Sequence, residues 1–239
     1  MYSIEQGLQL VRQRIASAER LYGRKAGEVR LLAVSKTRPA QAVRDALLAN
    51  QFCFGESYIQ EAVEKVEQVG RASDSRIEWH FIGRIQGNKT RLIAENFDWV
   101  HSLDSIKHAR RLSEQRPENL SPLKVCLQVN VDLEASKGGV EMDQVEAFVD
   151  ELSRLPNLQL EGLMTLPAHR DNLEEQRRPF ARLRKLRDRI ARSELPLATL
   201  SMGMSDDLEA AVAEGATIVR IGTAIFGPRD YAQASRSPQ

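Results

Sequence analysis

Short segments rich in apolar and β-branched residues recur along this chain, and stretches with helical periodicity separate them. Eight such segments occur about every twenty to thirty residues, at 29–34, 52–54, 79–82, 99–103, 125–129, 160–164, 199–202 and 218–221. Amphipathic helical spacing occupies the intervals, for example at 40–49, 59–69, 106–115, 145–155, 173–191 and 208–213. Repeated strand–helix units form parallel sheets, and eight of them can close without leaving an edge strand. The alternation therefore predicts an α/β fold, a single (β/α)8 TIM barrel.

A doubly wound open sheet is the alternative arrangement for the same alternation. Its usual phosphate signature, G-x-G-x-x-G, would follow the first strand, whereas this chain continues with VSKTRP at 34–39. The length of 239 residues also suits one barrel of roughly 250 residues. An extra helix should precede the barrel at 4–21, where apolar residues recur every three or four positions. We expect the barrel to span 1–227 and a polar tail, rich in Ser and Pro, to occupy 228–239.

The charge balance argues against a nucleic-acid or membrane partner. With 34 Lys and Arg against 33 Asp and Glu, the formal net charge is +1, so no global field attracts a polyanion. The basic stretch 177–192 has apolar residues along one face, which is typical of an outer barrel helix with a basic solvent side. The N-terminus lacks the basic and apolar regions of a signal peptide, and no apolar run reaches about eighteen residues. We expect a cytoplasmic protein.

Cysteine and histidine spacing gives little support for redox or metal chemistry. Cys53 and Cys126 lie in apolar runs without a C-x-x-C motif, so buried free thiols are expected. The histidines lack the ligand spacings typical of zinc sites; they are His80, His101, His108 and His169. We therefore expect no metal.

Polar and glycine residues follow almost every predicted strand. In a barrel these positions meet at one mouth, where functional groups collect. After the seventh strand, SMGMS at 201–205 precedes a helix, and after the eighth, Gly222 and Thr223 can form a tight anion-binding turn. For either loop alone, turn formation and helix capping by Asp206 explain the residues equally well; the two loops together favour the anion site. Lys36, after the first strand, is a Schiff-base candidate or a solvated lysine; with a phosphate site beside it, pyridoxal phosphate becomes the cofactor to consider.

Longer motifs then add a family resemblance over nearly the whole chain. They read AVSKT at 33–37, FGESYIQE at 54–61, WHFIGRIQGNK at 79–89, SKGGV at 136–140, GLM at 162–164, LSMGMSDD at 200–207 and VRIGTAIFG at 219–227. In these segments the chain resembles the pyridoxal phosphate homeostasis proteins of the YggS/PROSC type. The resemblance implies a barrel like the N-terminal domain of alanine racemase, without its C-terminal β domain.

The resemblance also implies site residues for pyridoxal 5'-phosphate. Lys36 would hold the cofactor aldehyde as an internal aldimine. The phosphate would lie against the loops after strands seven and eight, with Ser201, Ser205, Gly222 and Thr223 as contributors. Arg220 would face the pyridine nitrogen, and because a guanidinium cannot accept a proton from the ring, it would weaken the electron sink that carbanion chemistry needs.

Several neighbouring residues have less definite roles. Ser57 stands where the family pattern usually has Asn in Phe-Gly-Glu-Asn-Tyr, which shortens one polar arm near the mouth. Asn88 and Lys89 follow the third strand and, like Lys137, are candidates either for contacts or for plain solvated loop residues. Tyr58 and His80 are expected to be packed in the interior rather than catalytic, so neither is proposed as a catalytic base.

Two functions remain open at this stage. The first is a protein that carries or buffers pyridoxal phosphate for intracellular homeostasis, has no committed catalytic reaction and passes the cofactor to apo-enzymes. The second is a small racemase or lyase on the same barrel. A racemase of the alanine racemase pattern takes one base from a C-terminal domain of a neighbouring subunit, and this sequence ends about a dozen residues after 226–227, so we expect a monomeric carrier. A metal-dependent hydrolase would need clustered ligands that the sequence does not offer.

Overall fold

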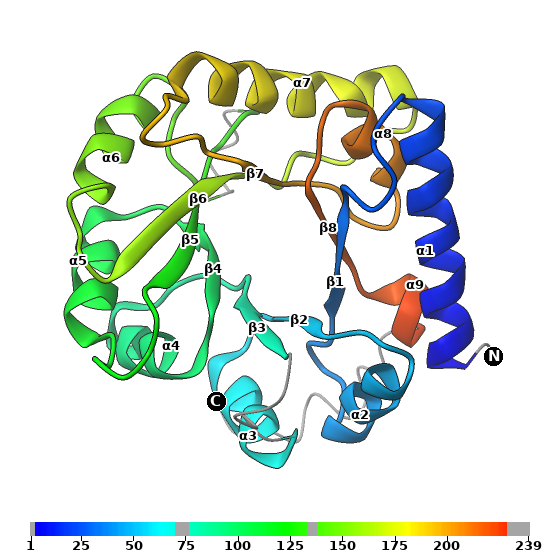
Figure 1. The fold of residues 1–239 in the computed structure, drawn as a ribbon, viewed down its shortest axis with the longest axis horizontal. Helices are drawn as coiled ribbons and strands as arrows, with labels where there is room; N and C mark the ends of the chain where they lie inside the picture. Colours follow the sequence, from blue (N-terminus) through cyan, green and yellow to red (C-terminus); the bar gives the residue numbers. More distant parts are fainter. Residues whose placement is uncertain (1–2, 70–76, 133–137, 229–239) are drawn as a thin grey trace.

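A closed barrel of parallel strands forms the centre of the protein. The computed structural model describes residues 3–69, 77–132 and 138–228. Within them, eight strands follow one another around the barrel in chain order, and β8 pairs with β1 to close it (Figure 1). The strands are β1 (Arg30–Val34), β2 (Cys53–Glu56), β3 (Glu78–Phe81), β4 (Trp99–Leu103), β5 (Leu123–Gln128), β6 (Leu158–Met164), β7 (Thr199–Ser201) and β8 (Ile218–Ile221). The predicted (β/α)8 barrel is confirmed.

Helices surround the barrel and connect each strand to the next. They are α1 (Ile4–Leu21), α2 (Ala40–Leu48), α3 (Ile59–Val69), the 3-10 turn η1 (Gly87–Lys89), α4 (Thr90–Asn96), α5 (Ile106–Gln115), α6 (Val145–Leu152), α7 (Leu173–Ile190), α8 (Leu208–Ala213) and α9 (Thr223–Phe226). The extra helix α1 begins with a capping box between Ser3 and Gln6, and it packs against α8 and α9 (Figure 1). This contact closes the outer ring on the side where the chain enters.

Three short helical elements were absent from the sequence-based prediction. The interval between the third and fourth strands contains η1 and the seven-residue α4, and a four-residue α9 follows β8. None of the three is long enough to show two full turns of apolar periodicity, so the pattern could not reveal them. The ends of β4 and β8 are as predicted, and those of the other strands differ by at most two residues, which is the usual uncertainty of such boundaries.

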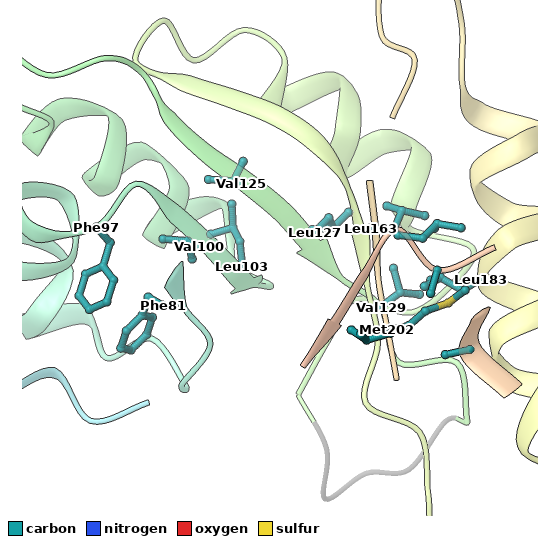
Figure 2. Packing of buried hydrophobic residues seen from close by; sticks show 14 of the residues in the cluster. Phe81, Phe97, Val100, Leu103, Val125, Leu127, Val129, Leu163, Leu183 and Met202 are labelled. Atoms are coloured by element: carbon teal, nitrogen blue, oxygen red, sulfur yellow. The ribbon is translucent and has the colours of Figure 1, made fainter. Parts of the chain in front are cut away.

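The apolar core lies mainly between the sheet and the helices. Figure 2 shows part of it, where Val100, Val125, Leu127 and Leu163 from β4, β5 and β6 are buried in one cluster. A second, smaller cluster of Trp99, Cys126 and Met164 is separate from it. Successive side chains of a strand point to opposite faces, so alternate residues of β4, β5 and β6 supply the outer cluster and the inner one. The barrel interior is thus partly apolar, and its remaining space holds polar side chains.

Three further predictions concerned membrane spans, the C-terminal tail and the basic stretch of the chain. None of the described helices combines the length and the apolar character that crossing a membrane requires. Of the expected tail, only Pro228 falls within the described residues. The basic stretch in α7 is an outer helix, with Phe180, Leu183 and Leu186 buried against the core.

Candidate functional site

The carboxyl ends of β1, β6, β7 and β8 surround a cavity of about 230 Å³. Its lining consists of Val34, Lys36, Arg38, Ile82, Met164, Leu166, Met204, Ser205, Asp206, Arg220, Gly222, Thr223 and Gly227. Five of the six cofactor-binding candidates from the sequence therefore meet in one place. The cavity also offers apolar walls from Ile82, Met164 and Leu166, as a flat aromatic ring would need.

Larger hollows occur elsewhere, but their linings do not contain this combination. One of about 380 Å³ lies between α1 and the amino ends of β1 and β2. Another, of about 450 Å³, lies beside the start of β6. Ligands of (β/α)8 barrels bind at the carboxyl ends of the strands, so the smaller mouth cavity is the candidate site.

Lys36 lies in the turn that follows β1, and hydrogen bonds from α3 and β2 shape this turn. The Thr37 N–H donates to Glu61 Oε1 at 2.6 Å, and Thr37 has a φ of 63°, which is rare for a residue with a side chain. The Ser35 hydroxyl donates to Glu56 Oε1 at 2.6 Å. The residues on both sides of Lys36 are therefore held to neighbouring elements, which limits where its amino group can reach.

A buried lysine on α3 supports the same turn through hydrogen bonds. Lys65 Nζ donates to the Ser35 carbonyl at 2.9 Å, to Glu56 Oε1 at 2.7 Å and to Glu61 Oε1 at 2.8 Å. Burial raises the pKa of Glu56, while Lys65 opposes this shift. This cluster was not predicted from the sequence. The spacing of Glu61 and Lys65 on one helix face was the available signal, although such pairs usually lie in solvent.

Arg220 projects from β8 and is buried beside the cavity. One guanidinium nitrogen donates to Ser201 Oγ at 2.7 Å, and the other donates to the Thr165 carbonyl at 2.9 Å. Burial lowers the pKa of Arg220 to about 10, so the guanidinium remains charged at neutral pH. Among the described residues, no carboxylate forms an ion pair with it. A buried cation whose hydrogen-bond partners are neutral favours a ligand that can accept hydrogen bonds.

Ser205, Gly222 and Thr223 also line the cavity. Gly222 precedes α9 and lies so close to β1 that an added Cβ would be 3.1 Å from the Val34 carbonyl oxygen. Thr223 begins α9, and the first N–H groups of a helix have no acceptor within it. Arg14 holds the Ser205 carbonyl at 3.0 Å and so fixes the loop after β7. These lining residues carry the hydroxyl and backbone N–H groups that anion sites use.

Ser201 is the one candidate that lies outside the cavity lining. Its side chain is fully buried below Arg220, and its hydroxyl contacts His101 Nδ1 at 2.7 Å as well as the guanidinium. Its predicted contact with a phosphate stays a prediction. In this structure the hydroxyl supports Arg220.

The other residues considered in the sequence, among them Tyr58, His80 and Ser57, lie outside the lining of the cavity. His80 is buried as expected, but the expected packing of Tyr58 is wrong, because its side chain is 53% exposed at the start of the α3 region. Ser57, Asn88 and Lys89 are not among the lining residues of the cavity. Gly83, in the loop after β3, lies against Ser57, where an added Cβ would be 2.1 Å from the Ser57 carbonyl oxygen.

Two further expectations concern lysine and cysteine residues. Lys137 lies outside the described residues. Both thiols are free; Cys126 is fully buried, whereas Cys53 is only half-buried, so its expected burial is wrong. The reason is position: Cys53 opens β2 at the amino end of the barrel, where the wall meets solvent.

Comparisons with known proteins agree with this fold. The family model for the alanine racemase N-terminal domain matches residues 8–230. An alanine racemase from Corynebacterium glutamicum shares the fold, with a TM-score of 0.68 over 91% of this chain and 62% of that chain at 18% identity. A barrel of the alanine racemase N-terminal type, with a lysine after its first strand, defines the class of protein.

More similar relatives narrow the family. A protein of Pseudomonas aeruginosa named pyridoxal phosphate homeostasis protein is 53% identical over 97% of this chain and 98% of its own length. The PipY protein of Synechococcus elongatus, whose structure has PLP bound, is 38% identical, with a TM-score of 0.75 over 89% of this chain and 100% of that chain. The chain belongs to the pyridoxal phosphate homeostasis protein family.

Proposed function

We propose that this chain binds pyridoxal 5'-phosphate in the mouth cavity and carries or buffers it, with covalent attachment at Lys36. The observation that carries the proposal is the meeting of Lys36, the buried Arg220 and the donors around Gly222 in one cavity. Its volume of about 230 Å³ is below the roughly 300–1,000 Å³ of drug-sized pockets, as suits a small ligand. The PLP-bound relative, PipY, supports the same assignment.

The residues present fit the groups of the cofactor. Pyridoxal phosphate supplies an aldehyde that condenses reversibly with a primary amine, with loss of water. Lys36 would provide that amine, and Ser205, Gly222 and Thr223 would hold the phosphate. The guanidinium of Arg220 would lie at the pyridine nitrogen, while Ser201 holds it from below.

Arg220 also favours a carrier over a racemase or lyase. Since a guanidinium only donates hydrogen bonds, it keeps the ring nitrogen unprotonated and limits stabilisation of a carbanion. A carrier has no need of that stabilisation. We therefore infer delivery of the cofactor to apo-enzymes as the role of the site, rather than a committed reaction of its own.

Visible absorption of the purified protein with added pyridoxal phosphate tests the proposal. The unmodified protein should turn yellow, and borohydride reduction followed by mass spectrometry should place the adduct on Lys36. Lys36→Ala should remove both signals and leave the fold intact, because a half-buried residue in the barrel mouth contributes little to the core. Lys89→Ala is the matched control, since that lysine lies outside the cavity, and it should keep both signals. An adduct on Lys89, or a protein that stays colourless, contradicts the proposal.

A further inference from the structure

A line of hydrogen-bonded polar side chains crosses the interior of the barrel beneath the cavity. Arg220 donates to Ser201 Oγ at 2.7 Å, Ser201 Oγ lies 2.7 Å from His101 Nδ1, and His101 Nε2 lies 2.9 Å from His80 Nδ1. All four side chains are buried. Barrel interiors are usually filled by branched apolar residues, so a polar line of this length needs an explanation.

The line connects parts of the barrel that are not neighbours in the sheet. His101 comes from β4, whose neighbours are β3 and β5, whereas Ser201 ends β7 (Figure 1). Their contact therefore passes through the interior and not along the barrel wall. His80 is fixed at its place by stacking on Trp99, with ring centroids 5.4 Å apart and planes 10° from parallel.

Elementary hydrogen-bond rules give this line a single direction. A guanidinium can only donate, so Ser201 Oγ accepts from Arg220. Within the described residues, the remaining acceptor for the Ser201 hydroxyl hydrogen is His101 Nδ1. His101 must then carry its hydrogen on Nε2 and donate it to His80 Nδ1.

His80 consequently carries its own hydrogen on Nε2, which points toward an acidic residue. Glu78 Oε2 lies 3.9 Å from this nitrogen, and no described group forms a hydrogen bond with it. The opposite direction would leave a buried hydroxyl without an acceptor and turn a ring lone pair toward the carboxylate. Burial lowers the pKa of both imidazoles, and the nearby His80 and Arg220 lower that of His101 further, so both rings are neutral at neutral pH.

The amino end of the line could be mistaken for a metal site. Cys53, Glu78 and His80 place one ligand atom each within 4.8 Å of the others. However, the Arg30 guanidinium donates to both Cys53 Sγ and Glu78 Oε2, and the hydrogen on His80 Nε2 occupies the third ligand position. The Arg30 guanidinium already stands in the place of a cation, so we assign the cluster as the charged end of the line and not as a metal site.

We propose that His101 is a positioning residue for the cofactor-binding arginine. By accepting the Ser201 hydroxyl hydrogen, His101 turns a Ser201 lone pair toward Arg220 and so holds the guanidinium at the cavity. The effect of His101 on cofactor binding rests on the proposed function. The direction of the hydrogen bonds does not depend on that function. A packing role would require only the size and shape of the ring.

Two substitutions separate positioning from packing. The amide of Asn at position 101 reaches the place of Nδ1 and can accept from Ser201, whereas the amide of Gln reaches the place of Nε2 and keeps only the contact with His80. His101→Gln should weaken the affinity for pyridoxal phosphate about five- to tenfold and shift the visible band, whereas His101→Asn should change the affinity by less than about twofold. If His101→Asn weakens binding as much as the better-filling His101→Gln, or if neither has an effect, the positioning role is wrong.

Nitrogen NMR of the imidazole rings tests the same inference without the cofactor. In the unmodified protein, His101 and His80 should each carry hydrogen on Nε2 and none on Nδ1. Hydrogen on Nδ1 of His101, or a doubly protonated ring at neutral pH, would overturn the proposed direction. Should the protein fail to bind pyridoxal phosphate while these tautomers are observed, the proposed function fails and the hydrogen-bond line remains.

Discussion

Successive side chains of β8 lie in different environments, the apolar core and the cavity. Val219 and Ile221 pack in the apolar core between the barrel and its helices, while Arg220 points inward to the cavity. The alternation of a strand thus places a charged group one residue away from two apolar anchors. This arrangement lets the core hold the arginine in place without contacting its charge.

Thr223 should contribute one hydroxyl donor to a bound phosphate. Thr223→Val removes that donor while keeping the shape of the side chain. A lost hydrogen bond to a charged group costs about 1.5–3 kcal/mol, so the affinity for pyridoxal phosphate should fall roughly ten- to hundredfold in equilibrium dialysis. Thr223→Ser, which keeps the hydroxyl, is the control and should bind nearly as well as the unmodified protein. Equal affinities for the Val and Ser variants would place the phosphate elsewhere.

Residue positions could be predicted from the sequence where chain order alone determines them. Lys36 and Thr223 follow strands, and the strand ends of a barrel meet at one mouth. Arg220 lies within β8, and its role was implied only by the family resemblance. The hydrogen bond between His101 and Ser201 could not be predicted, because 100 residues separate them and no sequence motif contains both. Only the closure of the barrel brings them together.

At the scale of single elements, α3 determines the geometry of the turn that carries Lys36. Glu61 and Lys65 lie on the same face of this helix and reach the Thr37 N–H and the Ser35 carbonyl respectively. The helix boundaries at Ile59–Val69 were predictable from apolar periodicity. The role of α3 in supporting the Lys36 turn was not predictable, because nothing in the periodicity distinguishes a buried lysine from a solvated one.

Lys65 should be important for stability. Its side chain is 3% exposed and that of Glu56 is fully buried, so Lys65→Met leaves a buried carboxylate without its counter-ion. Breaking a buried pair in this way costs about 3–5 kcal/mol, which urea unfolding should detect as a lower free energy of unfolding.

A second substitution checks that this loss comes from the unpaired charge. Adding Glu56→Gln to Lys65→Met removes the orphaned carboxylate and should restore part of the lost stability. Lys89→Met, at a lysine that forms no ion pair with the described residues, should change stability by less than about 0.5 kcal/mol. A Lys65→Met variant as stable as this control would show that the cluster contributes little.

In the whole molecule, the barrel has two chemically different ends joined by one polar line. The amino end holds the charged cluster of Arg30, Cys53 and Glu78, and the carboxyl end holds the cavity with Lys36 and Arg220. The (β/α)8 closure was predictable because eight strand–helix units leave few alternatives. The polar interior was not, since a histidine or serine within an apolar run has the same sequence pattern whether it packs or connects.

The difference between a carrier and an enzyme can be measured on the complete protein. With Arg220 at the ring nitrogen, the loaded protein should catalyse little exchange of the α-proton of L- or D-amino acids in deuterated water, because the electron sink is weak. The same preparation should transfer pyridoxal phosphate to an apo-enzyme that requires it, measured as recovered activity of that enzyme. Arg220→Glu, which favours a protonated ring nitrogen, should increase α-proton exchange if cofactor is still bound, as its absorption would show. Rapid, stereospecific exchange by the unmodified protein would instead establish a racemase, and the carrier function would have to be abandoned.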